Sequence, residues 1–212
     1  MKDIPLFTTQ NGIASLTLKE IPYTKKAYIR IQSSAEPLSL IDECCDFCRA
    51  LGAEEIYGTG HTCLEQFDRY CRIIRMRSLI KDTEDTGASL FPVTDKTIEK
   101  FREIYNKAMG DIPNAAHMTT VDGKELLVKG GGYFVHRDGE LLGIGIAKGD
   151  KVDAIVSVMP GSGKAVLMTL FHALADTTIE LEVAVENSAA IRLYEKVGFV
   201  PVEEVAIWYK II

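Results

Sequence analysis

A glycine-rich turn between a predicted strand and a predicted helix has the residue types that bind phosphate groups. Gly161, Ser162, Gly163 and Lys164 follow the apolar run 152–158 and precede apolar residues at helical spacing. Glycine lets the backbone come close to a ligand. The first turn of a helix also aims free amides and the positive end of the helix dipole at an anion. The pattern therefore predicts a diphosphate-binding turn that opens a helix.

The same turn does not match the nucleotide-binding P-loop. That loop needs a glycine five positions before the glycine that precedes its lysine, and a serine or threonine after the lysine. Val158 and Ala165 stand at these two positions. P-loop chemistry is therefore excluded, and a plain helix-entry turn is the alternative to a phosphate cradle.

A second stretch has several matching residue types at fixed spacing. Residues 179–185 alternate apolar and polar side chains, which is typical of a strand. Asn187 or Ser188 then caps a helix, and Gly198 stands where a left-handed C-cap belongs. Tyr194 falls on the apolar face of that helix. The stretch predicts a strand followed by a helix with a tyrosine on its inner side.

These two stretches resemble the cofactor-binding segments of the GNAT superfamily, the acyl-CoA-dependent N-acetyltransferases. The turn departs from the family pattern at Pro160, where the family has Gln or Arg, and it is shorter than usual. The likeness extends over residues 94–212 and implies an α/β (α+β) fold. That fold is a mixed, mostly antiparallel central sheet with helices on both faces, here with an N-terminal strand-helix-strand extension. The second segment matches the family at Asn187, Ala190, Leu193, Tyr194, Lys196, Gly198 and Phe199.

The resemblance implies a role for each matching position. It makes acetyl-CoA the co-substrate and implies direct transfer of an acetyl group to a primary amine. The backbone near Val158 would pair with the pantetheine arm, and Asn187 would bind its amide region. Tyr194 would protonate the leaving thiolate; the structural alternative is a core aromatic with a satisfied hydroxyl. The phosphates would lie against Gly161, Ser162, Gly163, Lys164 and Ala165.

The residue that removes the amine proton has several candidates. Glu182, on the polar face of the strand before Asn187, is preferred as general base. Glu180 shares that face, Asp153 lies on the neighbouring strand, and Ser157 could position a water instead. For each of these residues, a solvated position on the strand is the favoured alternative. The isolated histidines are interpreted as structural or surface residues: His117, His136 and His172.

Two further hypotheses come from other functional classes. A GNAT-like protein without catalysis would use the same cleft to bind acyl-CoA or a regulatory partner. A redox module would use Cys45 and Cys48, which form a Cys-x-x-Cys pair among five cysteines. Helical spacing instead predicts small buried thiols, and no second ligand pair of suitable spacing supports a metal site. We expect free thiols and no metal.

Composition excludes several functions. The chain has 212 residues, is 47% hydrophobic and 25% charged, and has a net charge of −6. This is globular composition, and an acidic balance disfavours nucleic acid as a partner. The sequence shows no signal peptide and no membrane-spanning run, so we expect a cytoplasmic protein. The acceptor would be a small-molecule amine or a protein amine. The apolar end, 205–212, is a candidate edge strand for a homodimer.

The elements that position these residues fall into two predicted domains. Residues 1–88 form an N-terminal strand-helix-strand unit of unknown role, either a degenerate GNAT half or a sheet extension. Residues 89–212 form the acetyl-CoA-binding domain, after a polar linker at 81–87. Asp138 and Gly139 predict a tight hairpin turn. Strands are expected at 27–31, 54–57, 72–80, 133–136, 141–146, 152–158, 179–185, 200–202 and 205–211, and helices at 37–51, 94–109, 114–128, 164–175 and 188–197.

Overall fold

A computed structural model describes residues 1–79, 85–174 and 178–212. Contacts between residues divide the chain into two compact units. Unit 1 comprises residues 1–73 and 204–212, and unit 2 comprises residues 74–203. The long strands β5 (Asp68–Leu79) and β11 (Val200–Lys210) contribute residues to both. The predicted domain boundary at 88/89 stays a prediction, and part of the predicted linker, 81–84, lies outside the described residues.

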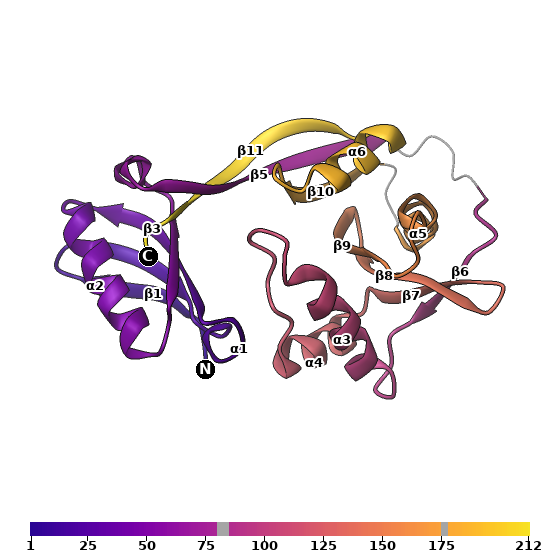
Figure 1. Ribbon diagram of the computed structural model, residues 1–212, viewed down its shortest axis with the longest axis horizontal. Coiled ribbons are helices and arrows are strands. Elements are labelled where there is room, and N and C mark those ends of the chain that lie inside the picture. Colours follow the sequence, from indigo (N-terminus) through magenta and orange to yellow (C-terminus); the bar gives the residue numbers. More distant parts are fainter. Residues whose placement is uncertain (80–84, 175–177) are drawn as a thin grey trace. The chain divides into compact units, whose positions relative to one another are not determined.

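Unit 1 is a sheet with one long helix against it (Figure 1). Strands β1, β2 and β3 form an antiparallel meander, and α2 connects β3 to β4, which is parallel to β3. The strand order is β1-β2-β3-β4-β11-β5. The remaining elements are β1 (Ile4–Thr9), β2 (Gly12–Thr17), α1 (Ile21–Thr24), β3 (Lys26–Ser34), α2 (Pro37–Ala50), β4 (Glu55–Thr59) and η1 (Thr62–Gln66).

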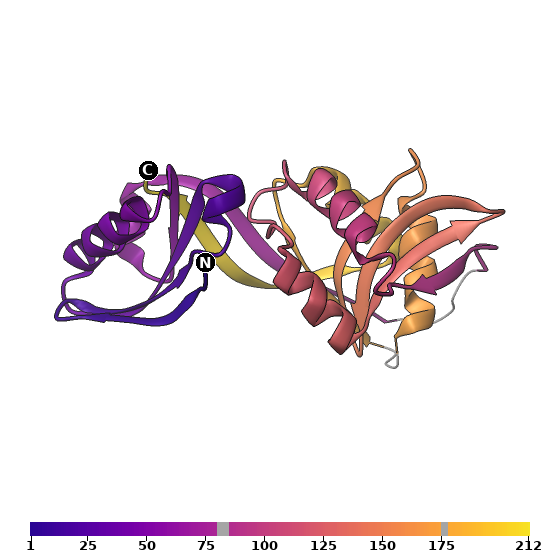
Figure 2. The same cartoon turned by 90° about the horizontal axis from the view of Figure 1, so that it is seen from below.

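Unit 2 is a larger sheet with helices on both faces (Figure 1, Figure 2). Its strand order is β11-β5-β10-β9-β8-β7-β6. Strands β6 to β9 are antiparallel, whereas β9 and β10 are parallel and joined through α5. Its other elements are β6 (Ser89–Pro92), α3 (Ile98–Met109), α4 (Thr120–Lys129), β7 (Gly132–Arg137), β8 (Glu140–Lys148), β9 (Lys151–Ser157), α5 (Gly163–Leu170), η2 (Phe171–Ala173), β10 (Thr178–Ala184) and α6 (Ser188–Val197).

Two hydrophobic clusters, one on each face, hold unit 2 together. On one face Val166, Leu167 and Leu170 of α5 pack with buried side chains of β10 and with partly buried ones of α6. On the other, Phe101 of α3 packs with Phe134 of β7, whose ring is 5.7 Å away. A sheet with apolar side chains on both faces must be covered on both. The predicted fold class, a mixed and mostly antiparallel sheet flanked by helices, is confirmed.

The capping residues fix the local structure where the sequence predicted them. The Asn187 side chain accepts a hydrogen bond from the Ala190 amide at 3.2 Å, and Gly198 has φ of +98° at the end of α6. Asp138 and Gly139 have φ of +53° and +83° in the β7–β8 hairpin, as a type I′ turn requires. These turns and caps depend on short-range hydrogen bonds and backbone conformation, which local sequence determines.

Several predicted elements differ from the structure. The end of the chain forms one strand, β11, and not two. It lies between β4 and β5, so it is not an edge strand; the expected homodimer loses that basis and stays a prediction. Helix α4 begins at Thr120 and not near residue 114, because Thr119 and Asp122 form a capping box. Strands β1, β2 and β6 were not predicted.

Both units contain the same connectivity but differ at one pair of strands. In each, a three-stranded antiparallel meander leads through a helix to a parallel strand. Strands β3 and β4 pair over five positions, from Lys26–Glu55 to Arg30–Thr59. Strands β9 and β10 pair among the described residues only at Lys151–Glu180. Unit 2 therefore has a parallel pair that diverges beyond its first register position.

Candidate functional site

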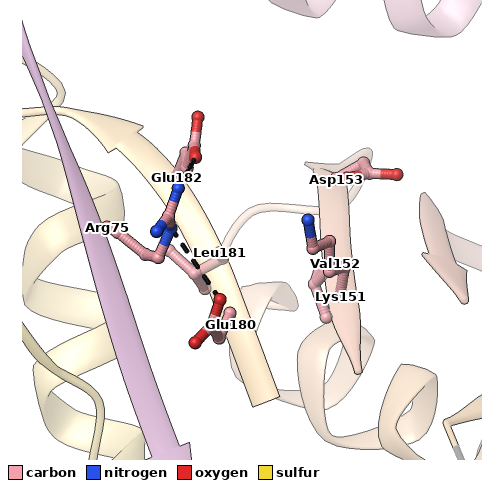
Figure 3. A pocket seen from close by; sticks show the side chains of 7 residues that line it. All are labelled: Arg75, Lys151, Val152, Asp153, Glu180, Leu181 and Glu182. Carbon is pink, nitrogen blue, oxygen red and sulfur yellow. Dashed lines mark hydrogen bonds and ion pairs between the residues drawn. The ribbon is translucent and has the colours of Figure 1, made fainter. Parts of the chain in front are cut away.

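A cavity of about 260 Å³ lies beside β9 and β10, where these strands diverge; we call it the wedge cavity (Figure 3). Its backbone surroundings are unusual for a sheet, because neighbouring strands normally exchange hydrogen bonds along their length. Strand β9 keeps its pairing to β8 on its other side. The residues that line the cavity are Arg75, Lys151, Val152, Asp153, Glu180, Leu181 and Glu182.

The glycine-rich turn after β9 has the geometry of an anion cradle. Gly161 has φ of +81°, a conformation that favours glycine. Ser162 is the N-cap of α5, yet its side chain makes no capping hydrogen bond. Its hydroxyl lies instead 2.8 Å from the carbonyl oxygens of Leu142 and Met159. The Ser162 side chain therefore does not occupy the amides at the start of α5, where an anion could bind.

Leu142 organises this turn, although no sequence pattern predicted that role. It is the extra residue of a β-bulge in β8, between the pairs Val135–Gly143 and His136–Leu141. Its carbonyl oxygen accepts hydrogen bonds from the Val158 amide at 2.9 Å and the Met159 amide at 3.2 Å. A bulge changes the direction of a strand locally. Only the strand pairing reveals it.

Gly163 brings the turn against α6. A Cβ atom at this position would lie 3.1 Å from the Ser157 hydroxyl oxygen and 3.2 Å from Leu193 Cδ2. Leu193 precedes Tyr194, so the turn and the tyrosine-bearing helix are neighbours. A second cavity, of about 440 Å³, is lined by four predicted cofactor residues together with Arg137: Gly161, Ser162, Lys164 and Ala165. Val158, Gly163, Asn187 and Tyr194 line neither cavity.

Tyr194 is half-buried against the core of unit 2. Its ring centroid is 5.8 Å from that of Phe199, and burial raises its pKa to about 12. No hydrogen bond to its hydroxyl is found within the described residues, and this oxygen is not among their fully buried unsatisfied atoms. The hydroxyl therefore retains access to solvent or to a ligand. The ring packs as a core aromatic while the hydroxyl stays available.

Glu182, the preferred base, belongs to an ion-pair network. Arg75 on β5 donates to Glu182 at 2.9 Å and to Glu203 at 2.5 Å, and its Nε lies 3.8 Å from Glu180. Figure 3 shows the Arg75 side chain between the two β10 carboxylates. Arg77 also binds Glu180, at 2.6 Å. The Glu182 carboxylate is therefore already engaged by the Arg75 guanidinium.

Asp153, another candidate base, differs from Glu182 in its place on the strand and in its ion pairing. It is the extra residue of a bulge in β9, between the pairs Ile146–Ala154 and Ala147–Val152. A bulge re-aims a side chain, and Asp153 lines the wedge cavity. Its pKa is raised by desolvation and by the charge of Glu182, against an opposing effect of Lys151. No ion pair or hydrogen bond of its carboxylate is found among the described residues.

The cysteines do not form a redox or metal centre in the described part of unit 1. Cys44, Cys45 and Cys48 are buried free thiols on α2. Burial raises their pKa values to about 12, 11 and 12. A reactive thiol needs a lowered pKa and access, so the redox hypothesis is wrong. In residues 1–79, 85–174 and 178–212, no group of His, Cys, Asp and Glu is arranged to hold a metal ion.

The strand order, the divergent parallel pair and the helix-opening turn are those of one fold class: the chain has the GNAT superfamily fold. One similar solved structure is a GCN5-related N-acetyltransferase from Sphaerobacter thermophilus, with 11% identity, a TM-score of 0.59 and coverage of 93% of this chain and 75% of that one. A GNAT-family acetyltransferase from Colwellia psychrerythraea has 12% identity, a TM-score of 0.53 and coverage of 97% and 84%.

A third similar structure is described as a tandem GNAT protein from the clavulanic acid biosynthesis pathway. It has 13% identity and a TM-score of 0.55, with coverage of 94% of this chain and 78% of that one. No family model and no curated protein matches the sequence. None of the helices in the described ranges has the length and apolar character needed to cross a membrane.

Proposed function

We propose that the protein is an acyl-CoA-dependent N-acyltransferase that transfers an acetyl group from acetyl-CoA directly to a primary amine. The observation that supports this most is the divergence of β10 from β9 beside a helix whose N-cap side chain, that of Ser162, makes no capping hydrogen bond. The divergence leaves β9 backbone groups for an extended ligand to pair with, and the turn offers amides to a diphosphate. One ligand that has both parts is an acyl-CoA.

The chain's own groups would hold this co-substrate at the predicted positions. The amides of Gly163, Lys164 and Ala165 would bind the diphosphate, with Lys164 adding a positive charge. Backbone near Val158 would pair with the pantetheine arm, and the Asn187 amide group would donate to it while its oxygen caps α6. When bound, the co-substrate supplies an activated thioester carbonyl. Its adenine end has room beside Arg137 in the larger cavity.

Proton transfer would involve two side chains of opposite function. A primary amine arrives as an ammonium ion and must lose a proton before it can attack. Asp153 would accept that proton, because its pKa is raised and no ion pair of its carboxylate is found among the described residues, whereas Glu182 is ion-paired to Arg75. Tyr194 donates a proton to the leaving thiolate. With a pKa of about 12, its hydroxyl is protonated at neutral pH and has the proton to give.

Unit 1 supplies no equivalent second site in this proposal. The parallel pair β3–β4 stays hydrogen-bonded over five positions, so no strand-sized gap opens there. Helix α2 begins with Glu36 as N-cap and Pro37 in its first turn. A carboxylate at the entrance and a missing amide both oppose anion binding. Unit 1 is then a GNAT-like half without a cofactor cleft, and one acetyl-CoA binds per chain.

A second function, acyl-CoA binding without catalysis, is favoured by one observation. Pro160 removes an amide from the turn, and Tyr194 lines neither of the two cavities. In that case the protein would bind the co-substrate as a regulatory module. In both cases we keep the cytoplasm as the place of action and a small-molecule or protein amine as the partner that catalysis requires.

Calorimetry with acetyl-CoA tests the proposal. The wild-type chain should bind one equivalent, and Gly163→Trp should abolish binding, because its ring does not fit between the turn, Ser157 and Leu193 and would displace the turn. Gly163→Ala is the matched control. Its Cβ meets only side-chain atoms at 3.1 and 3.2 Å, which can shift by a few tenths of an ångström. Failure of the wild type to bind would refute both functions, and binding without turnover of any amine would favour the second.

A further inference from the structure

The charged groups of the wedge cavity are not all paired with one another. Arg75 and Arg77 bind Glu180, Glu182 and Glu203, so these five charges largely satisfy each other across β5, β10 and β11. Two charged residues that line the cavity remain, Lys151 and Asp153. For neither is a direct ion pair or hydrogen bond found within the described residues. Lys151 and Asp153, whose charges attract each other, therefore add one cation and one anion to the lining of the same cavity.

These two residues belong to the same end of β9. Lys151 is the first residue of the strand, and its backbone forms the single register pair with Glu180. Asp153 is the bulged residue two positions on. Asp153 is thus close to Lys151 along the strand, and a lysine side chain is long and flexible. Figure 3 shows the Lys151 side chain running along β9 beside the gap that separates it from β10. The ammonium and carboxylate can thus both contact one small ligand.

We propose that the wedge cavity binds an acceptor amine that also bears an anionic group, with Lys151 as the residue that binds this group. This inference rests on the proposed function. The reacting ammonium lies against the Asp153 carboxylate, and a carboxylate or a similar anion a short carbon chain away lies against Lys151. A plain monoamine leaves Lys151 unpaired, and a diamine places its second cation beside Lys151. Amino acids and related amino-carboxylates are the matching substrate class.

The charged groups at and next to the cavity sum to one net negative charge. Five of them line it, Arg75, Lys151, Asp153, Glu180 and Glu182, and Arg77 and Glu203 pair with members of this set. Two arginines against three glutamates leave one negative charge in excess, and Lys151 and Asp153 add one charge of each sign. Complementary placement of single charges gives specificity more than affinity. Lys151 would therefore select among acceptors and would not by itself determine whether acetyl-CoA binds.

A matched acceptor panel tests this role. Thiol release from acetyl-CoA is measured with amino-carboxylates and with the same amines lacking the carboxylate. The wild type should prefer the carboxylate-bearing amine by at least about tenfold in kcat/KM, as expected for one hydrogen bond to a charged group. Lys151→Met should remove that preference, and Lys151→Glu should reverse it in favour of diamines. Lys148→Met is the control, since Lys148 pairs across from Lys151 on β8 and does not line the cavity.

A binding measurement separates this inference from the proposed function. Amide NMR spectra of the wild type are titrated with β-alanine, propylamine and propionate. β-Alanine should shift the Lys151 and Asp153 signals at lower concentration than either single-charge probe, whether or not transfer occurs. Transfer to amines without preference for a carboxylate would overturn the inference and leave the proposed function standing. If the wild type bound β-alanine, Lys151→Met abolished that binding, and acetyl-CoA did not bind, the proposed function would fail while the amino-carboxylate site would stand. Equal or absent shifts with all three probes would overturn the inference.

Discussion

Exchanging Asp153 and Glu182 one at a time for their amides should separate catalysis from stability. Asp153→Asn removes the proposed proton acceptor, so kcat/KM should fall by about 10²- to 10⁴-fold, the usual effect of a general base. Glu182→Gln removes the 2.9 Å ion pair with Arg75, whose side chain is 29% exposed against 49% for Glu182. An exposed pair of this kind contributes about 0.2–1 kcal/mol. For a chain of this size that is roughly 0.4 to 4 °C in Tm.

The two variants should change stability in opposite directions at neutral pH. The pKa of Asp153 is raised in the folded state, so the stability this group contributes is present at low pH and is lost as pH rises through its folded pKa. Asp153→Asn removes the group whose ionisation lowers stability as pH rises. The free energy of unfolding at neutral pH should therefore stay unchanged or rise by up to about 0.5 kcal/mol. The raised pKa also moves the acid limb of kcat/KM to higher pH. The assays are steady-state kinetics and urea unfolding from pH 4 to 8.

One outcome would contradict this reasoning directly. If Glu182→Gln lost as much activity as Asp153→Asn and kept its stability, Glu182 would be the base and its ion pair with Arg75 would not restrain it. Adding salt distinguishes the cases further. Screening weakens exposed ion pairs, so the stability difference between wild type and Glu182→Gln should shrink at high salt while the activity of Asp153→Asn stays low.

Three further outcomes are expected. Tyr194→Phe should lower kcat about tenfold or more with unchanged affinity for acetyl-CoA. The wild type should lose no activity from Tyr194 ionisation below about pH 11, since the pKa of Tyr194 is about 12. Equal kcat in the two proteins would remove Tyr194 from the mechanism. Iodoacetamide at pH 8 should label the partly exposed Cys63 well before Cys44, Cys45 or Cys48, as followed by mass spectrometry. Burial raises the pKa values of these three thiols to about 12, 11 and 12, so few are thiolates at pH 8. Early modification at Cys45 would contradict the buried placement of this face of α2. Thr119→Ala should lower the free energy of unfolding, measured in urea, by about 0.5–2 kcal/mol because the α4 cap is lost. The same substitution at the exposed neighbour, Thr120→Ala, should lower it far less. Similar values for the two variants would argue against the capping box.

The sequence by itself determined the local features of this protein. The Asn187 and Gly198 caps, the Asp138–Gly139 turn and the glycine-rich entry to α5 each depend on residues within a few positions of one another. Hydrogen bonds of that range and the backbone freedom of glycine are set by local chemistry. The period of the apolar residues likewise predicted most strands and helices, and the fold class followed from the resemblance of two segments to a known family. The same local rule failed where a competing cap was overlooked, as at Thr119.

Only the tertiary structure decided which groups meet and which do not. The β9–β10 divergence, the bulges at Leu142 and Asp153 and the internal place of β11 are properties of strand pairing between distant segments. Arg75 lies far from Glu182 and Glu203 in the chain, so no spacing rule could show that it holds both. That one contact moves the proposed base from Glu182 to Asp153, because Arg75 already engages the Glu182 carboxylate, whereas no ion pair of Asp153 is found among the described residues.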